Sequence, residues 1–123
     1  MIRKEIPSTE WSRFLEAFTM QHDGWLVDVE SVTSGRSSVE AKARPLEGVV
    51  PRLGTDEPRR VIVTVGGSIE KHQRIVVPEP ETIHVRAENG VETGLEIESH
   101  DGSLTRIQFV SPVSPETIDG ISA

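Results

Sequence analysis

The sequence predicts an α+β fold in which one N-terminal helix packs on a twisted antiparallel sheet, or half-open barrel, of six to seven strands. Two observations predict it. Apolar residues recur with a helical period between residues 11 and 18, and from residue 25 to about 110 they alternate with polar residues at a period of two. Turns rich in glycine, proline and small polar residues separate the alternating segments. Residues 1–123 are interpreted as a single domain.

The helix is expected over about residues 8–22. Its apolar face consists of Trp11, Phe14, Leu15 and Phe18, which lie at i, i+3, i+4 and i+7. Ser8 or Thr9 can cap its start, and Gly24 can end it in a left-handed conformation. Apolar residues at this spacing are more often core than partner surface, so the face is interpreted as core.

Seven segments have the alternation of strands: 25–30, 39–44, 61–65, 72–77, 82–87, 91–99 and 103–110. The second is expected to end at Pro45, with a bent continuation over 45–50. Residues 61–65 are apolar on both faces, which indicates a central strand covered on both sides. Residues 111–123 are expected to form an irregular tail.

The triplet His-Asp-Gly occurs twice, at 22–24 and 100–102, and raises the question of a histidine–carboxylate site. Each copy is interpreted as turn chemistry, because each ends an element at a glycine. A three-residue loop at 100–102 places Leu95 opposite Ile107 and Glu96 opposite Arg106. Aliphatic side chains then share one face of the sheet and charged side chains the other, whereas a slip of one residue would mix them.

One candidate ligand or metal site lies on the charged face. A three-residue loop at 88–90 places Gly94 opposite His84, with Glu92 and Glu96 on the same strand as the glycine and Arg106 beyond them. A histidine and two carboxylates around a missing side chain can hold a divalent ion. The favoured alternative is a solvated face with cross-strand ion pairs, since antiparallel sheets usually leave one face polar. No metal is therefore expected.

Three arginines in one loop form a second candidate site. Arg52, Arg59 and Arg60 can together clamp a carboxylate or phosphate. Asp56 and Glu57 lie between them and partly cancel their field. A solvated loop is the favoured interpretation, because exposed charge runs contribute little.

The composition argues against several function classes. There is no cysteine, which excludes disulfides and cysteine nucleophiles, and no signal-peptide pattern, so a cytoplasmic protein is expected. No apolar run approaches the ~20 residues of a membrane span. The net charge of −7, the absence of tyrosine and the presence of only three Phe and two Trp argue against nucleic-acid binding.

No catalytic residue and no cofactor are predicted. Gly66 and Gly67 follow an apolar strand, but the spacing of a phosphate-binding loop is absent, and no serine occurs in G-x-S-x-G. A distant serine–histidine–carboxylate arrangement has no support above background. Exposed strand edges are a liability, so pairing of two copies through a sheet edge, giving a homodimer, is one expected solution.

Three stretches carry a resemblance: EIPSTEWSRFLEAFTMQHDGWLVDVE, ARPLEGV and LEIESHDGSLTRIQFVSPVSPETIDGI, about half of the chain. They resemble a family of small bacterial proteins known only as a domain of unknown function. The order of a helix followed by antiparallel strands is also similar to that of Sm-like and SH3-like barrels, by analogy alone. The family resemblance implies a compact bacterial domain and no assigned activity.

The function expected from the sequence is that of a non-enzymatic binding or scaffold module. The alternative is a small metal- or ligand-binding barrel, or an enzyme, that uses the face of His84, Glu92 and Glu96.

Overall fold

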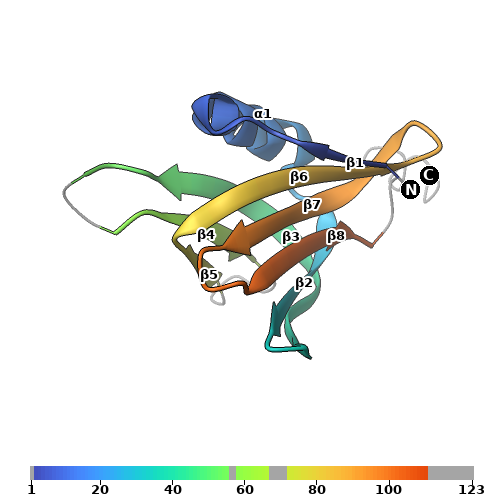
Figure 1. Cartoon of the computed structure of the whole chain (residues 1–123). Helices are drawn as coiled ribbons and strands as arrows, with labels where there is room; N and C mark the ends of the chain where they lie inside the picture. Colours follow the sequence, from blue (N-terminus) through green and yellow to red (C-terminus); the bar gives the residue numbers. More distant parts are fainter. Residues whose placement is uncertain (1, 56–57, 67–71, 111–123) are drawn as a thin grey trace, which may run out of the picture.

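The computed structural model describes residues 2–55, 58–66 and 72–110. In this part of the chain, eight strands form one antiparallel sheet that does not close, and a short α-helix lies beside it (Figure 1). The strand order is β1-β6-β7-β8-β2-β3-β4-β5. The elements are β1 (Ile2–Glu5), a 3-10 turn (Ser8–Glu10), α1 (Trp11–His22), β2 (Leu26–Thr33), β3 (Arg36–Arg52), β4 (Arg60–Val65), β5 (Gln73–Pro78), β6 (Pro80–Glu88), β7 (Val91–Ser99) and β8 (Leu104–Phe109).

The α+β architecture is confirmed, but the count of six to seven strands is wrong, because β1 precedes the helix. This strand pairs with β6, placing Ile2 opposite Ala87 and Glu5 opposite His84. All four of its residues are exposed. A short, charged edge strand without alternation lacks the signals by which strands are recognised in a sequence. The predicted irregular tail, residues 111–123, lies outside the described residues.

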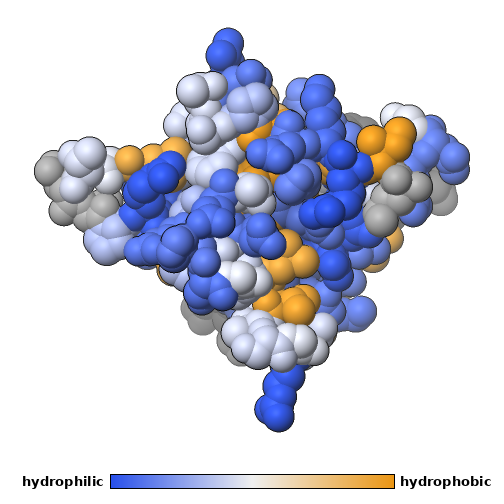
Figure 2. Space-filling view, in the orientation of Figure 1, coloured by the Kyte–Doolittle hydropathy of each residue, from blue (hydrophilic) through white to orange (hydrophobic). Residues whose placement is uncertain are grey.

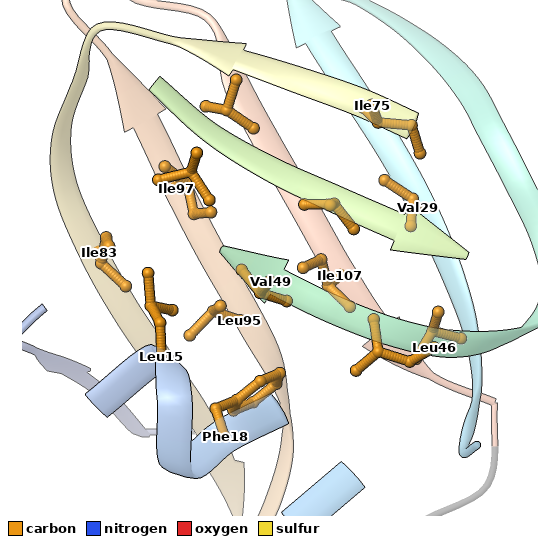
Figure 3. Packing of buried hydrophobic residues seen from close by; sticks show 14 of the residues in the cluster. Leu15, Phe18, Val29, Leu46, Val49, Ile75, Ile83, Leu95, Ile97 and Ile107 are labelled. Carbon is orange, nitrogen blue, oxygen red and sulfur yellow. The ribbon is translucent and has the colours of Figure 1, made fainter. Parts of the chain in front are cut away.

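The curvature of the sheet comes from β3, which is 17 residues long. Its first half pairs with β2 and its second half with β4, with register shifts on both sides of the bend. At the bend Ala43 has a positive φ of 51°, and its N–H donates to the Asp28 carboxylate at 2.7 Å. The expectation that the strand ends at Pro45 is wrong, because β3 runs through that residue to Arg52, whereas the continuation expected over 45–50 is confirmed. As a result β3, β4 and β5 fold over β6, β7 and β8 (Figure 3).

The hydrophobic core lies between the two halves of the sheet, and α1 closes one side of it. Trp11, Leu15 and Phe18 are buried, as the helical period predicts. Thr19 Oγ1 accepts the N–H of Val49 at 3.0 Å and donates to its carbonyl at 3.3 Å. A helix side chain thus satisfies backbone groups of β3 that no neighbouring strand reaches there. The described helix is too short and too polar to cross a membrane.

Both His-Asp-Gly triplets end an element, as predicted. The first begins at His22, the last residue of α1, and its Gly24 has a φ of +85°, while Gly102 in the second has a φ of +89°. His22 is in addition a core residue, only 6% exposed. Its ring centroid lies 4.5 Å from that of Phe18 and 4.7 Å from that of Phe109.

The predicted register of β7 and β8 is confirmed. Leu95 pairs with Ile107 and Glu96 with Arg106. The Ser99 N–H donates to Ser103 O at 2.8 Å, which closes the three-residue loop. The alternation of inward and outward side chains is therefore enough to predict the pairing register of this hairpin from the sequence.

The predicted register of β6 and β7 is wrong. Only Asn89 and Gly90 form the loop, and both have positive φ, 52° and 79°, which is the signature of a tight two-residue turn. A β-bulge then shifts the pairing, so that His84 lies opposite Glu96 rather than Gly94, which lies opposite Arg86. The shorter loop and the bulge each move the register by one residue in the same direction, and the total shift of two residues leaves the inward and outward positions unchanged. Aliphatic side chains therefore still face the core.

Candidate functional site

A row of charged and polar side chains crosses five strands on the outer face of the sheet. Successive register partners form it: Glu5 on β1, His84 on β6, Glu96 on β7, Arg106 on β8 and Glu30 on β2. In the view of Figure 2, hydrophilic colours predominate over this part of the molecule. Because cross-strand partners alternate in charge along much of the row, it is a network of neighbouring ion pairs.

Glu96 differs from the expectation of a solvated residue, since it is only 5% exposed. Three arginines cover it: Arg3 Nη2 lies 2.9 Å from Oε1, Arg106 Nε 3.0 Å from Oε2, and Arg86 Nε 3.5 Å from Oε2. The stems of long basic side chains exclude water while their charged heads neutralise the carboxylate. Both oxygens of Glu96 are therefore already committed to protein partners.

The predicted group of His84, Glu92 and Glu96 is brought together only in part. His84 lies opposite Glu96, and its Nε2 is 3.7 Å from Glu5. The bulge pairs Glu92 with the inward position 87, and its carboxylate lies 3.9 Å from Nε2 of the helix residue His22. Among the described residues, no three histidine, aspartate or glutamate side chains are grouped as a metal site requires.

The three predicted arginines divide between two neighbouring places. Arg52 and Arg60 are cross-strand partners at the ends of β3 and β4. Arg59 and Arg60 line a cavity of about 370 Å³. Asp56 and Glu57, the acids expected to cancel their field, lie outside the described residues.

The cavity, which we call the seam pocket, lies where the two halves of the sheet meet without pairing. Its lining residues are Pro58, Arg59, Arg60, Val76, Pro78, Glu79, Ser99, His100 and Asp101. It is bounded by the end of β5 on one side and by the β7–β8 turn on the other. Two backbone hydrogen bonds fix these walls: Glu79 N to Arg59 O and His100 N to Glu79 O, both 2.9 Å.

The lining of the seam pocket combines apolar walls with a few polar groups. Val76 and Pro78 provide apolar surface from β5. Ser99 is only 2% exposed, and its Oγ has no hydrogen-bond partner in the described part of the chain. The Arg59 guanidinium lies 5.7 Å from the centroid of the Trp11 ring, a cation–π arrangement. Arg59 makes no ion pair with a described carboxylate.

The β7–β8 turn adds a titratable pair at the mouth of the pocket. The hydrogen bond from His100 Nδ1 to Glu81, at 2.5 Å, raises the pKa of the exposed imidazole above its ordinary value. Hydrogen bonds from the Ser103 hydroxyl and N–H lower the pKa of Asp101. A second hollow of about 250 Å³ adjoins the pocket and shares Arg59, Glu79 and His100 with it.

Reasoning from the sequence identified two of these residues, Arg59 and Arg60, and missed the others. The sequence predicts Ser99 at the end of a strand and His100 at the tip of a hairpin. Both predictions are correct locally, but the position of these residues beside β5 depends on the bend of β3, which brings β5 against the end of β7. A local pattern carries no signal for such a long-range contact.

The chain matches no known family model, no curated protein and no solved structure. The resemblance to small bacterial proteins therefore stays a prediction, and the sites are judged by their own chemistry.

Proposed function

We propose that this chain is a non-enzymatic binding module and that the seam pocket holds a small anion with an apolar body. The observation that carries the proposal is the guanidinium of Arg59, which lines the pocket beside the apolar surface of Val76 and Pro78 and makes no ion pair with a described carboxylate. Ser99 also lines the pocket, but its hydroxyl oxygen is buried and has no hydrogen-bond partner among the described residues. The charge of Arg59 is therefore the group that a ligand in the pocket can reach.

The charges around the pocket favour an anion. Arg59 contributes a cation with no described carboxylate partner. Among the neighbouring acids, Asp101 accepts two hydrogen bonds from Ser103, and Glu81 is paired with His100. Glu79 also lines the pocket, and its carboxylate offsets part of the positive charge of Arg59 and Arg60. The apolar walls favour a ligand that also has a hydrocarbon portion, since binding sites of this kind combine apolar surface with a few placed polar groups.

The alternative, a metal or ligand site on His84, Glu92 and Glu96, has less support. The bulge turns Glu92 toward His22, and arginines occupy both oxygens of Glu96. Stoichiometric metal in the purified protein that is lost in His84→Ala would favour that alternative.

We also propose a location, an oligomeric state and an absence of one partner class. A cytoplasmic location agrees with the absence of cysteine, and a bacterial origin rests on the family resemblance alone. Pairing of two copies through an exposed edge strand agrees with the open sheet, whose two end strands are β1 and β5. The net charge of −7 supports the expectation that the chain does not bind nucleic acid.

The test compares 2-naphthoate with its neutral isostere, 2-naphthamide, by fluorescence titration. A charge-assisted hydrogen bond contributes roughly 1.5–3 kcal/mol, so the anion should bind at least about tenfold more tightly than the amide. Arg59→Gln should remove that preference, whereas Arg13→Gln on the exposed side of α1 should change neither affinity. Equal binding of the two probes to the unmodified protein would refute the proposal.

A further inference from the structure

A second surface lies on the outer face of β3, β4 and β5. It shares Arg60 and Val76 with the lining of the seam pocket, and its other residues lie outside that pocket. Cross-strand partners there form an apolar row of Val50, Ile62 and Val76. Positions two residues away along the strands carry arginines: Arg52 on β3, Arg60 on β4 and Arg74 on β5. We call these six residues the basic–apolar face.

The charge of this face is opposite to that of the protein. The net charge of the chain is −7, yet the rows through positions 48–52, 60–64 and 74–78 present no outward carboxylate among their paired residues. Arg52 and Arg74 make no ion pair with a described residue. Cations that the protein does not neutralise itself are available to a partner, and complementary charge increases both the rate and the specificity of association.

The apolar row is exposed at its two ends and buried at its centre. Val50 is 42% exposed and Val76 is 53% exposed, whereas Ile62 between them is 4% exposed. At the β3 end the exposed surface continues into a hollow of about 380 Å³ between β3 and α1, where Met20 is 74% exposed. The exposed valines and this hollow provide apolar contact points for a partner beside the arginines.

The spacing of the rows fits a helix. Arg52 and Arg60 lie on one side of the apolar row and Arg74 lies on the other side. The two flanking rows are four residues apart along the strands, which corresponds to ~13 Å at ~3.3 Å per residue. An α-helix with its side chains has a diameter of ~10–12 Å. A helix that lies along Val50, Ile62 and Val76 therefore has arginines on both flanks.

We propose that the basic–apolar face docks an acidic amphipathic helix of a partner protein, with the apolar stripe of that helix on the valines and its glutamates or aspartates between the arginines. Helix-in-groove recognition of this type reads apolar anchors at i, i+3/i+4 and i+7. An anionic membrane is the less favoured occupant. The whole chain carries a charge of −7, so an anionic bilayer attracts the arginines of this face but repels the rest of the protein.

The experiment uses the full chain and a fluorescein-labelled synthetic helix that is stapled to hold its conformation. The helix carries leucine at i, i+4, i+7 and i+11 with glutamates on both flanks, and a matched peptide carries lysines instead. Fluorescence anisotropy should give at least tenfold tighter binding of the acidic peptide, and its affinity should fall as salt is raised. Binding of the two peptides within threefold of each other would overturn the proposal.

Variants separate this face from the seam pocket. The double variant Arg52→Glu/Arg74→Glu should lose at least tenfold in affinity for the acidic peptide, and Val50→Ser, which keeps all charges, should lose about threefold or more. Arg36→Glu, an exposed charge change at the other end of β3, and Arg59→Gln in the seam pocket should bind as the unmodified protein does. Thermal unfolding of each variant checks that it is folded.

Two results would overturn the proposal at this stage. The first is peptide binding by Arg52→Glu/Arg74→Glu that stays within threefold of the unmodified protein. The second is tighter binding to phosphatidylglycerol vesicles than to the peptide, in which case a membrane surface is the occupant. Because Arg59→Gln tests only the seam pocket, failure of one proposal leaves the other intact.

Discussion

Neutralising Glu96 tests whether the charged row on the outer face is a structural network. The change is Glu96→Gln, which keeps the shape of the side chain and removes its charge. The side chain of Glu96 is 6% exposed, and those of Arg86, Arg106 and Arg3 are 18%, 30% and 49% exposed. Removal of one partner from a buried ion pair costs about 3–5 kcal/mol, because the other charge stays buried without compensation.

The expected magnitude is smaller here, since the arginines are less buried than the carboxylate. Arg3 can regain water, so its contribution is discounted to that of a surface pair, ~0–1 kcal/mol. Arg86 and Arg106 remain partly enclosed, which leaves an expected loss of about 2–3 kcal/mol in the free energy of unfolding. With a urea m-value of about 1.5 kcal/mol/M, the midpoint should fall by roughly 1.5–2 M.

Urea unfolding monitored by tryptophan fluorescence measures this loss, with Glu98→Gln as the matched control. Glu98 is exposed on the same strand, two residues further along, and its neutralisation should change stability by less than ~0.5 kcal/mol. The reasoning is refuted if Glu96→Gln and Glu98→Gln unfold at the same urea concentration. It is also refuted if 0.5 M NaCl abolishes the difference, because buried pairs are little screened.

Three further predictions concern other parts of the chain. Gly94→Ala should destabilise the protein by roughly 1–3 kcal/mol, because the new methyl group meets the backbone carbonyl of Ile107 in β8. Gly54→Ala should be tolerated, because nothing lies within 4 Å of the added methyl group. Chemical denaturation measures both changes in stability. In an NMR titration, the pKa of His100 should lie above about 6.5 and should return toward that value in Glu81→Gln. Because the pKa is raised only in the folded state, the His100–Glu81 pair stabilises the fold fully below pH ~6.5, and this stabilisation is lost as the pH rises through the pKa of the folded state. An unchanged midpoint in Glu81→Gln would contradict this. Thr19→Val should cost about 1–3 kcal/mol and accelerate hydrogen exchange at the end of β3, because two backbone groups lose their partner; Thr19→Ser should retain most of the stability.

The sequence was sufficient wherever a local pattern and the fold agree. The helical period of residues 11–18 predicts which helix side chains are buried, and the alternation from residue 82 onward predicts that Leu95, Ile97 and Ile107 face the core. Both predictions depend on the burial of one face of the helix or strand, which decides which residues face the core. For this reason the inward and outward residues of β6 and β7 are predicted correctly, although the length of their loop is predicted wrongly.

The failures have two physical origins. A β-bulge moves one residue without changing the apolar pattern around it, so the loss of Glu92 from the face of His84 could not be read from alternation. The burial of Glu96 depends on arginines from three strands, including the unpredicted β1, that converge on one carboxylate. Similarly, the seam pocket depends on the angle of the bend in β3, which sets how closely β5 approaches the β7–β8 turn. The sequence indicates Arg59 as a possible anion-binding residue from its charge, whereas the cavity beside it can be recognised only in the folded structure.

The central claim, that the seam pocket is the ligand site, is tested most directly by an amide NMR titration of the full chain with 2-naphthoate. The account predicts that the largest shift changes occur at Arg59, Val76, Ser99 and His100 and that they vanish in Arg59→Gln, with 2-naphthamide producing much smaller changes. Shift changes centred on His84 and Glu96 instead, or changes of equal size with the neutral probe, would contradict it.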